Sequence, residues 1–351
     1  MKKTLLLVAL FIFSIVEAQT ISTVFSNQTT NTSGIAINGN TLYAGGFFDG
    51  IIYKVDLSQP NPTASTYVSV PEDIYDLCIK GNYLYASVSA ISADSGRIIR
   101  IDITQPNPTV ENVISLPFPN GITIDNEYLY VNSDKKLLRI DLNAPNATPV
   151  VVVDNLNVDR ILGTNGLLVI GNYIFVSTPN KLVKYNLGQT NPQETLVVSG
   201  FTTLQGITKG ETDTIIYGTE YNPDHVVKIN TADGTFSQIA TTPSRTNWDI
   251  IFTGNGFYVS NLEGGDVIKI DMSLSVDDFH KDKIKIYPVP SANIVNFEKG
   301  MFLGLTEMDG KHIDVKNNNG NSIDISDLPK GTYIVKLNVE GKIFHKKIVK
   351  K

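Results

Sequence analysis

The chain has 351 residues, of which 42% are hydrophobic and only 18% are charged, and its net charge is −6. Low charge together with 15 Tyr and 15 Phe argues against disorder, and the acidic balance excludes a general nucleic-acid-binding protein. The single cysteine, Cys78, excludes an intramolecular disulfide and a cysteine-based zinc site. The composition therefore indicates a folded, β-rich protein of about two domains.

The first residues have the pattern of a secretory signal peptide. Lys2 and Lys3 precede an apolar run over residues 5–16, and Ala18 supplies a small residue at the expected cleavage position. The run is shorter than the roughly 20 apolar residues that a membrane-spanning helix needs. We therefore expect residues 1–18 to be a signal peptide and the mature protein to be exported without a transmembrane segment.

Two short phrases recur six times in the middle of the chain. The first combines a glycine or asparagine turn with an aromatic strand, as in residues 39–43 and 81–85. The second is an apolar–basic–apolar strand that ends in Asp or Asn, about 43 residues after the previous copy. The closing residues are Asp56, Asp102, Asp141, Asn186, Asn230 and Asp271. Since they recur in every copy, we expect them to form Asx turns rather than a metal site.

Each copy contains four segments with the alternating pattern of β-strands. Four strands in about 43 residues, repeated six times, are typical of β-propeller blades. The sixth copy lacks its fourth strand, and an unassigned β segment lies ahead of the first copy at residues 20–25. We expect this segment to complete the sixth blade and close the ring, which removes both open sheet edges. The sequence thus predicts an all-β protein with a six-bladed β-propeller over residues 19–276.

The repeated phrase resembles that of NHL-type and related six-bladed propellers, over about residues 20–276. The matching features are a Gly-Ile pair, a Gly-Asn turn, an X-Leu-Tyr strand and the sequence Ile-Tyr-Lys-Val-Asp at residues 52–56. The resemblance implies the fold and says little about activity, because propellers carry many unrelated functions.

The last seventy residues follow a different pattern. After a polar linker at residues 277–282, residues 283–351 contain seven or so short strands separated by turn residues, which predicts a small β-sandwich. Three motifs stand out, and their residues are Tyr287, Pro288 and Pro290; Gly310 and Lys311; and Leu328, Gly331 and Tyr333.

These motifs make residues 283–351 similar to the type A C-terminal sorting domain of the type IX secretion system of Bacteroidetes. Val289 stands where that family usually has Asn. The resemblance implies recognition by the secretion machinery and its sorting peptidase, removal of the tail, and a secreted or outer-membrane-surface location. An ordinary carbohydrate-binding or adhesive sandwich is the alternative.

The candidate site lies where the innermost strands of the blades begin. Aligning the copies brings Gly34, Asp76, Gly121, Gly166, Gly206 and Asp249 to one position, and Ser33, Tyr75, Asn120, Asn165, Gln205 and Trp248 to the position before it. We expect these groups to form a polar ring around the central channel. Oxygen ligands from Asp76, Asp249, Asn120 and Asn165 could hold a hard cation such as Ca²⁺.

Three further side chains complete this predicted ligand-binding ring. Trp248 and Tyr75 could stack on a sugar or a planar ligand, and Arg245 could pair with an anion. The alternative is that all these groups line a wet channel and satisfy one another and water.

Two functions follow from this sequence. His225 is the only histidine in the predicted propeller, and we expect it to be a surface residue in a loop. The scarcity of catalytic groups favours a non-enzymatic binding module with a glycan, peptide or small-molecule ligand and no certain cofactor. The alternative is a Ca²⁺-dependent hydrolase resembling gluconolactonase-like propellers, whose members hold a divalent cation with Glu, Asn and Asp. This chain has no Glu at the aligned ring position.

Charge divides unevenly along the chain. Residues 19–280 contain 14 Lys and Arg and 26 Asp and Glu, a net charge of −12. The predicted propeller is thus more acidic than the whole chain, and we expect cations, neutral sugars or basic surfaces to be its partners.

Overall fold

The computed structural model describes residues 20–26, 31–90, 95–145, 147–156, 158, 166–243, 246–272, 285–298, 300–307, 311–318, 321–339 and 342–351. The chain divides into two compact units, Met1–Leu274 and Ser275–Lys351. The predicted signal peptide and the predicted linker at residues 277–282 lie outside the described residues. Within those residues, no helix has the length and apolar character needed to cross a membrane.

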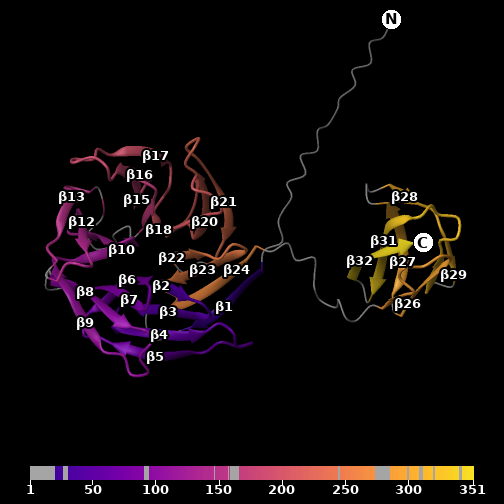
Figure 1. The fold of residues 1–351 in the computed structure, drawn as a ribbon, viewed down its shortest axis with the longest axis horizontal. Coiled ribbons are helices and arrows are strands. Elements are labelled where there is room, and N and C mark those ends of the chain that lie inside the picture. The colour runs from indigo at the N-terminus through magenta and orange to yellow at the C-terminus, as the bar shows by residue number, and fades with distance from the viewer. Residues whose placement is uncertain are drawn as a thin grey trace, which may run out of the picture. The chain divides into compact units, whose positions relative to one another are not determined.

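The first unit is a six-bladed β-propeller, as the repeats predicted. It consists of six four-stranded antiparallel sheets, which surround a common centre in Figure 1. The first strand of each sheet is innermost and contacts its counterparts in the neighbouring blades; these strands are β2, β6, β10, β14, β18 and β22. Blades one to three contain β2 (Thr32–Asn38), β3 (Thr41–Gly46), β4 (Ile51–Asp56) and β5 (Ala64–Ser69); β6 (Asp73–Lys80), β7 (Tyr83–Ala90), β8 (Ser95–Asp102) and β9 (Val110–Leu116); and β10 (Pro119–Asp125), β11 (Tyr128–Ser133), β12 (Lys136–Asp141) and β13 (Val150–Val153).

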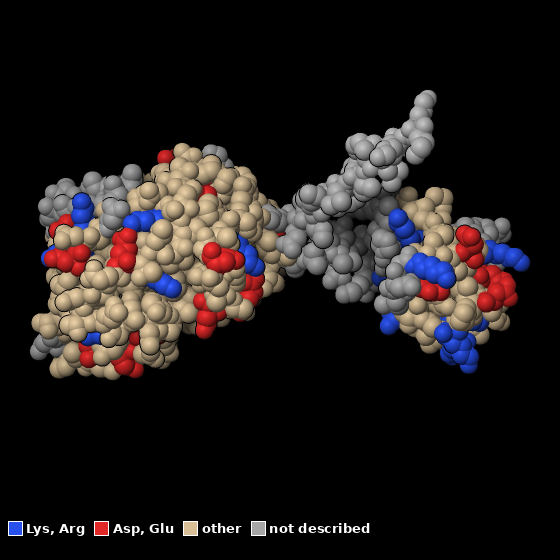
Figure 2. Space-filling model, turned by 90° about the horizontal axis from the view of Figure 1, so that it is seen from above, with Lys and Arg blue, Asp and Glu red and all other residues tan. Residues whose placement is uncertain are grey.

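The remaining blades repeat the same order of strands. They contain β14 (Leu167–Ile170), β15 (Tyr173–Thr178), β16 (Lys181–Asn186) and β17 (Thr195–Ser199); β18 (Leu204–Lys209), β19 (Ile215–Glu220), β20 (His225–Asn230) and β21 (Thr235–Thr241); and β22 (Asn247–Phe252), β23 (Gly256–Asn261) and β24 (Asp266–Asp271). Uncharged residues cover most of the side of this unit that Figure 2 shows, with acidic and basic residues scattered among them.

Strand β1 (Thr20–Ser26) supplies the missing outer strand of blade six. It pairs antiparallel with β24, with Thr20 opposite Asp271 and Ile21 opposite Ile270. The prediction that the segment before the first repeat closes the ring is therefore confirmed. The side chain of Phe25 is buried, and its ring centroid lies 5.9 Å from that of Tyr53 in blade one.

Alternating apolar residues form the core between adjacent blades. Ile52 of blade one and Ile74 and Leu84 of blade two are fully buried in one shared cluster. Each such side chain contributes roughly 1.5–3 kcal/mol through its burial. The blades thus stabilise one another face to face, and the repeated pattern fixes which face of each strand is inside.

The residues that end the third strands of blades one to five form Asx turns, as the repeats predicted, whereas the residue two positions after Asp271 lies outside the described residues. The Oδ1 atoms of Asp56, Asp102 and Asp141 accept backbone hydrogen bonds of 2.9 Å from the amides of Ser58, Thr104 and Asn143. Asn186 and Asn230 do the same in blades four and five. Hydrogen bonding, led by the Ser58 hydroxyl, lowers the pKa of Asp56.

The second unit consists of two four-stranded sheets around one apolar core. One sheet contains β25 (Ile286–Tyr287), β26 (Ile294–Phe297), β30 (Ser322–Asp324) and β29 (Lys316–Asn318), and the other contains β28 (His312–Ile313), β27 (Met301–Glu307), β31 (Gly331–Val339) and β32 (Lys342–Lys350). Val295, Leu305, Val335 and Ile348 are fully buried between them. The predicted small sandwich is therefore present, with eight described strands.

Candidate functional site

Asp76 and Asp249 lie on the innermost strands β6 and β22, and each carboxylate joins two blades. Asp76 Oδ1 accepts a hydrogen bond of 2.8 Å from its neighbour Leu77 N, and Oδ2 accepts one of 2.8 Å from Ile122 N in blade three. Asp249 Oδ1 is bonded by Ile250 N at 2.7 Å, and Oδ2 by Ile35 N of blade one at 2.9 Å. All four carboxylate oxygens therefore accept hydrogen bonds from the backbone.

The glycines that align with these aspartates have a packing role. A β-carbon on Gly34 would lie 2.4 Å from the Cα of Asp76, and one on Gly206 would lie 2.7 Å from the Cα of Asp249. Any larger residue would push the neighbouring inner strand away. The Gly and Asp residues at the aligned position are thus complementary partners from adjacent blades.

Burial makes both aspartates weaker acids than usual. It raises the pKa of Asp249 to about 6. It also raises the pKa of Asp76 well above its ordinary value, and the charge of Asp249 adds to this effect. The negative charge of Asp249 therefore favours the protonated form of Asp76.

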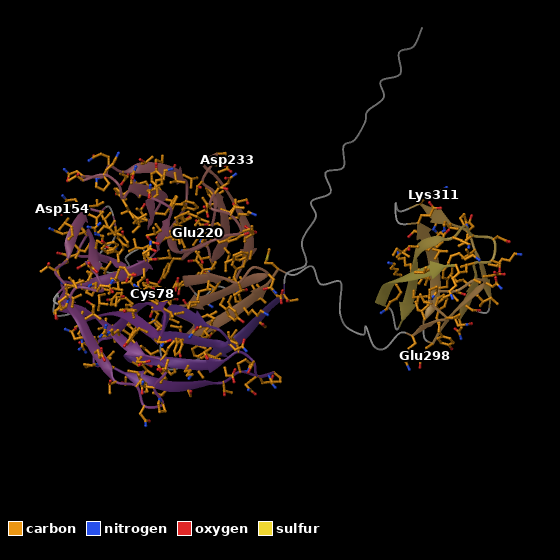
Figure 3. All side chains as sticks on the ribbon, viewed as in Figure 1. Cys78, Asp154, Glu220, Asp233, Glu298 and Lys311 are labelled. Carbon is orange, nitrogen blue, oxygen red and sulfur yellow. The ribbon has the colours of Figure 1, made fainter. Side chains whose placement is uncertain are left out.

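Cys78 follows Asp76 on the same strand, and Figure 3 shows it near the middle of the ring of sheets. Burial, with a further contribution from Asp76, raises the pKa of its thiol well above the ordinary value. The thiol is therefore protonated at neutral pH, in agreement with its interpretation as a small hydrophobic residue.

Trp248 and Tyr75, the predicted stacking residues, lie inside an aromatic cluster with Phe47 and Phe118. Trp248 is 1% exposed and Tyr75 is 0% exposed. The ring of Phe47 contacts both edge-on, with centroid distances of 4.8 Å to Tyr75 and 5.8 Å to Trp248. Trp248 Nε1 donates a hydrogen bond of 3.3 Å to the carbonyl oxygen of Tyr75. A ligand could stack on these rings only after this aromatic cluster opened.

Of the other predicted ring residues, Asn120 and Gln205 lie on inner strands, as expected, and Asn165 and Arg245 do not belong to the described residues. Asn120 and Gln205 are both buried, and their backbone carbonyl oxygens accept hydrogen bonds from the hydroxyls of Ser87 and Ser177 in the preceding blades. Among the described residues, no three His, Cys, Asp or Glu side chains lie close enough together to hold a metal ion.

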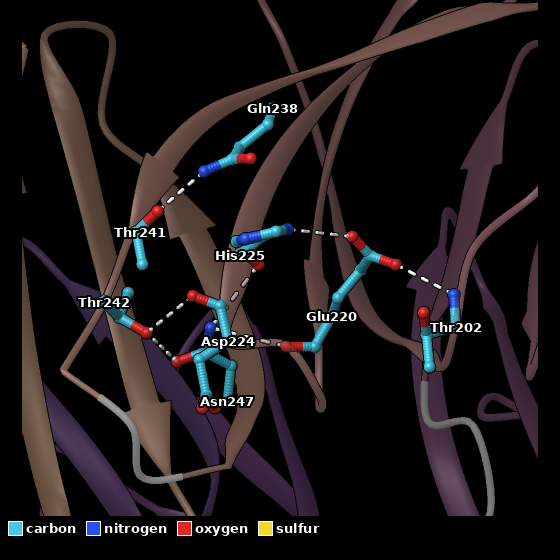
Figure 4. Close-up of polar contacts among 8 residues, drawn as sticks. All are labelled: Thr202, Glu220, Asp224, His225, Gln238, Thr241, Thr242 and Asn247. Atoms are coloured by element: carbon cyan, nitrogen blue, oxygen red, sulfur yellow. Dashed lines mark hydrogen bonds and ion pairs between the residues drawn. The ribbon is translucent and has the colours of Figure 1, made fainter.

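A second polar cluster, which the sequence did not reveal, lies where β19 ends and β20 begins (Figure 4). The Glu220 carboxylate is 5% exposed, accepts a hydrogen bond of 2.9 Å from Thr202 N, and lies 3.5 Å from His225 Nδ1. The prediction that His225 lies in a loop was wrong, because it is the first residue of strand β20. The pairing of β20 with β21 begins at this residue.

This cluster continues into blade six through Asp224, Thr242 and Asn247. Asp224 Oδ1 accepts a hydrogen bond of 2.8 Å from Thr246 N, and Thr242 Oγ1 donates one of 2.8 Å to Asn247 Oδ1. Neither Glu220 nor Asp224 belongs to the repeated phrases, so the repeat pattern could not identify them as members of a buried cluster. Only the Asn-Pro-Asp-His sequence at residues 222–225 marked an irregular loop.

In the second unit, the sorting-motif residues divide into exposed and buried sets. Tyr287 is 53% exposed, and Lys311 is also exposed. Tyr333 is buried, its hydroxyl donates a hydrogen bond of 2.8 Å to Pro329 O, and Leu328 packs against the same core. Gly331 begins β31, Pro288 and Pro290 are exposed, and Gly310 lies outside the described residues.

Two units are thus defined: a six-bladed β-propeller and a small sandwich that bears the sorting motifs. Residues 285–351 match the family model described as the secretion system C-terminal sorting domain. This match indicates type IX secretion-dependent export to the cell surface or the extracellular space. No curated protein matches the chain.

Solved structures with the same propeller fold have low sequence identity to this chain. A structural-genomics protein of unknown function from Bacteroides thetaiotaomicron VPI-5482 is 16% identical, with a TM-score of 0.59 over 72% of this chain and 76% of that one. XC5397 from Xanthomonas campestris, a gluconolactonase, is 11% identical, with a TM-score of 0.57 over 73% and 90%. A luciferin-regenerating enzyme is 12% identical, with a TM-score of 0.56 over 72% and 95%. At such identities the likeness establishes the fold alone.

Proposed function

We propose that this exported propeller is a non-enzymatic binding module that acts outside the cell. The observation that carries the proposal is the engagement of the channel carboxylates: both oxygens of Asp76 and of Asp249 accept hydrogen bonds from backbone amides. A hard cation would have to compete with these bonds for the same oxygens. The role that fits the aspartates best is therefore structural: they hold the inner strands of different blades together through hydrogen bonds.

The aromatic cluster and the Glu220 cluster support the same proposal. A hydrogen bond between Trp248 and Tyr75 connects the inner strands of blades six and two. Hydrogen bonds among Asp224, Thr242 and Asn247 connect blades five and six. Buried, mutually satisfied polar groups make a rigid framework that can present loops and side chains to a partner. In this proposal the propeller binds the ligand, and the C-terminal domain directs export of the protein.

The alternative is a Ca²⁺-dependent, lactonase-like hydrolase with its site in the channel. One observation favours it: Asp249 has a pKa raised to about 6, a value suited to a general base near neutral pH. The gluconolactonase among the similar structures makes this reaction class a reasonable comparison.

Calcium binding separates the two functions. We would measure the melting temperature of the full chain in EDTA and in excess Ca²⁺, for the wild type, for Asp249→Ala and for the matched exposed control Asp213→Ala. The binding-module proposal predicts the same Ca²⁺-dependent shift, near zero, in all three proteins. A rise in the wild type and in Asp213→Ala that Asp249→Ala abolishes would support the channel metal site and overturn the proposal.

The finer question is whether the protein is released or stays attached to the surface. We propose that the tail is removed after export, between the end of the propeller and residue 285. Mass spectrometry of the protein from a type IX-competent host would identify the new C-terminus and any attached group. A mature form that still contains residues 285–351 would contradict removal.

A further inference from the structure

Two grooves lie at equivalent positions on the rim of the propeller, each between the outer part of one blade and a loop of the next. The blade 6–1 groove, of about 480 Å³, is lined by Tyr258 and Lys269 of blade six and by Gln59–Pro62 of blade one. The blade 2–3 groove, of about 640 Å³, is lined by Arg100 and Asn112 of blade two and by the loop that contains Asn143 and Thr148 of blade three. Both volumes fall within the usual range of small-molecule sites.

The register of the strands establishes that the grooves are equivalent. Lys269 on β24 lies opposite Tyr258 on β23, and Arg100 on β8 lies opposite Tyr85 on β7. Each basic residue is therefore at the same place on the third strand of its blade. The opposite wall is in both cases the loop between the third and fourth strands of the following blade.

Hydrogen bonds and prolines hold these loop walls in place. In blade one, Asp56 accepts bonds from Ser58 N at 2.9 Å and from Gln59 Nε2 at 3.0 Å. In blade three, Asp141 Oδ1 accepts a bond of 2.9 Å from Asn143 N. Pro60 and Pro145 restrict the backbone further. Since the walls are already ordered, a ligand would bind without a large cost for ordering them.

The basic residues of both grooves already have acidic partners. Arg100 Nε lies 2.7 Å from Glu111 Oε2, and its guanidinium lies over the ring of Tyr83 at 4.9 Å. Lys269 Nζ lies 3.3 Å from Asp271 Oδ2. The grooves therefore present little net charge, and neutral ligands suit them better than anions.

The remaining lining offers amides, hydroxyls and flat apolar faces. Gln59 and Asn61, with Tyr258, line the first groove, and Asn112, Asn143 and Thr148 line the second. Pro60 and Pro145 add exposed ring faces beside them. Paired donors and acceptors next to small apolar faces are the complement of a sugar ring, which has hydroxyls at its edge and C–H groups on its faces.

We propose that the two grooves are subsites for neutral glycans, one between blades six and one and the other between blades two and three. This inference rests on the proposed binding function and names its ligand class and its location. Two equivalent subsites on one chain would strengthen binding to a surface with many copies of the same glycan. A third groove lies at the corresponding place between blades three and four, lined by Val152–Asn155 and Asn191–Glu194, but its volume of about 280 Å³ falls below the usual range of small-molecule sites. The turn at residues 231–234 of blade five is shorter and supplies no comparable wall.

The test uses the full chain on an array of neutral and acidic glycans, followed by calorimetry with a soluble neutral glycan that binds. Asn61→Trp and Thr148→Trp fill one groove each from exposed loop positions, and Ala232→Trp places the same side chain on the blade-five turn as a control. We expect two sites per chain in the wild type and in the control, one in each single variant and none in the double variant. Each single variant should also lose at least tenfold in binding to a dense glycan surface.

Asn61→Ala and Thr148→Ala guard against a folding defect, since they remove polar groups without adding bulk, and they should weaken binding in the same order. An array with no neutral glycan bound, a preference for acidic glycans, or two-site binding by the double variant would overturn the inference. None of these results depends on Ca²⁺, so the failure of the groove inference is distinguishable from that of the proposed function.

Discussion

The carboxylate of Asp249 accepts a hydrogen bond of 2.9 Å from the backbone amide of Ile35, 214 positions earlier in the chain. This bond connects the inner strands of blades six and one. At the outer edge of blade six, β1 pairs with β24. The ring is therefore closed at two places: near its centre by the Asp249 side chain, and at the outer edge of blade six by strand β1.

Phe25 tests the closure at the outer edge. It is buried at 6% exposure against Tyr53, so Phe25→Ala should lower the free energy of unfolding by about 3–5 kcal/mol. Ile21→Ala, on the same strand but 40% exposed, should change it by about 0.5 kcal/mol or less. Guanidinium unfolding of the full chain gives both values. Equal effects of the two substitutions would contradict a closing role for β1.

Asp249 makes the stability of the propeller depend on pH. Its pKa is raised to about 6 in the folded protein from an ordinary value of 3.8, so between these values the folded state binds more protons than the unfolded state. The free energy of unfolding should therefore increase as the pH falls from 7 to 5, with a further contribution from the raised pKa of Asp76.

The matched variants are Asp249→Asn and the exposed Asp213→Asn. We expect the difference in stability between pH 5 and pH 7 to shrink in the first and to match the wild type in the second. Chemical unfolding at both pH values provides the measurement. An unchanged pH difference in Asp249→Asn would show that this carboxyl does not carry the effect.

Trp248 is the only tryptophan of the chain and reports directly on the aromatic cluster. Because it is 1% exposed, its emission in the folded protein should be blue-shifted, with little quenching by iodide. Trp248→Ala should cost about 3–5 kcal/mol of stability, and Trp248→Phe should cost less because an aromatic ring still packs against Phe47. Strong iodide quenching of the folded wild type would contradict a closed cluster.

Glu220 should act through its buried partners. Glu220→Ala leaves Thr202 N without its acceptor and removes the partner of His225 Nδ1, and we expect a loss of about 1–3 kcal/mol. The exposed Glu263→Ala, which removes the same charge from the same part of the propeller, should cost about 0.5 kcal/mol or less. Thermal and chemical unfolding check both. A smaller effect for Glu220→Ala than for the control would argue against a structural role for this cluster.

Much of the architecture could be predicted because its signals are local. Alternation of apolar residues marks each strand, and Gly39 and Gly81 adopt positive φ in the hairpin turns. The Asp or Asn at the end of the third strand forms its own Asx turn in blades one to five. Each of these features depends on residues close together in sequence. Six repeats of such a unit, together with the unassigned strand ahead of them, leave a closed ring as the simplest arrangement.

The roles of the candidate site residues were decided only by tertiary structure. The alignment brought Asp76 and Asp249 to one position and suggested cation ligands, but their partners Ile122 and Ile35 belong to other blades. The same holds for Trp248, whose exposure depends on rings from blades one and two.

The sequence by itself determined the six-bladed ring, its closing strand and the export tail. Hydrophobic periodicity, turn residues and motif order depend only on residues that are close together in the chain, so they can be recognised without the tertiary structure. Tertiary structure decided which polar groups join blades and which remain on the surface. Burial and hydrogen bonding depend on what the neighbouring blades bring to each side chain, so the chain order alone could list Asp76, Asp249 and Trp248 as candidates but could not assign their roles.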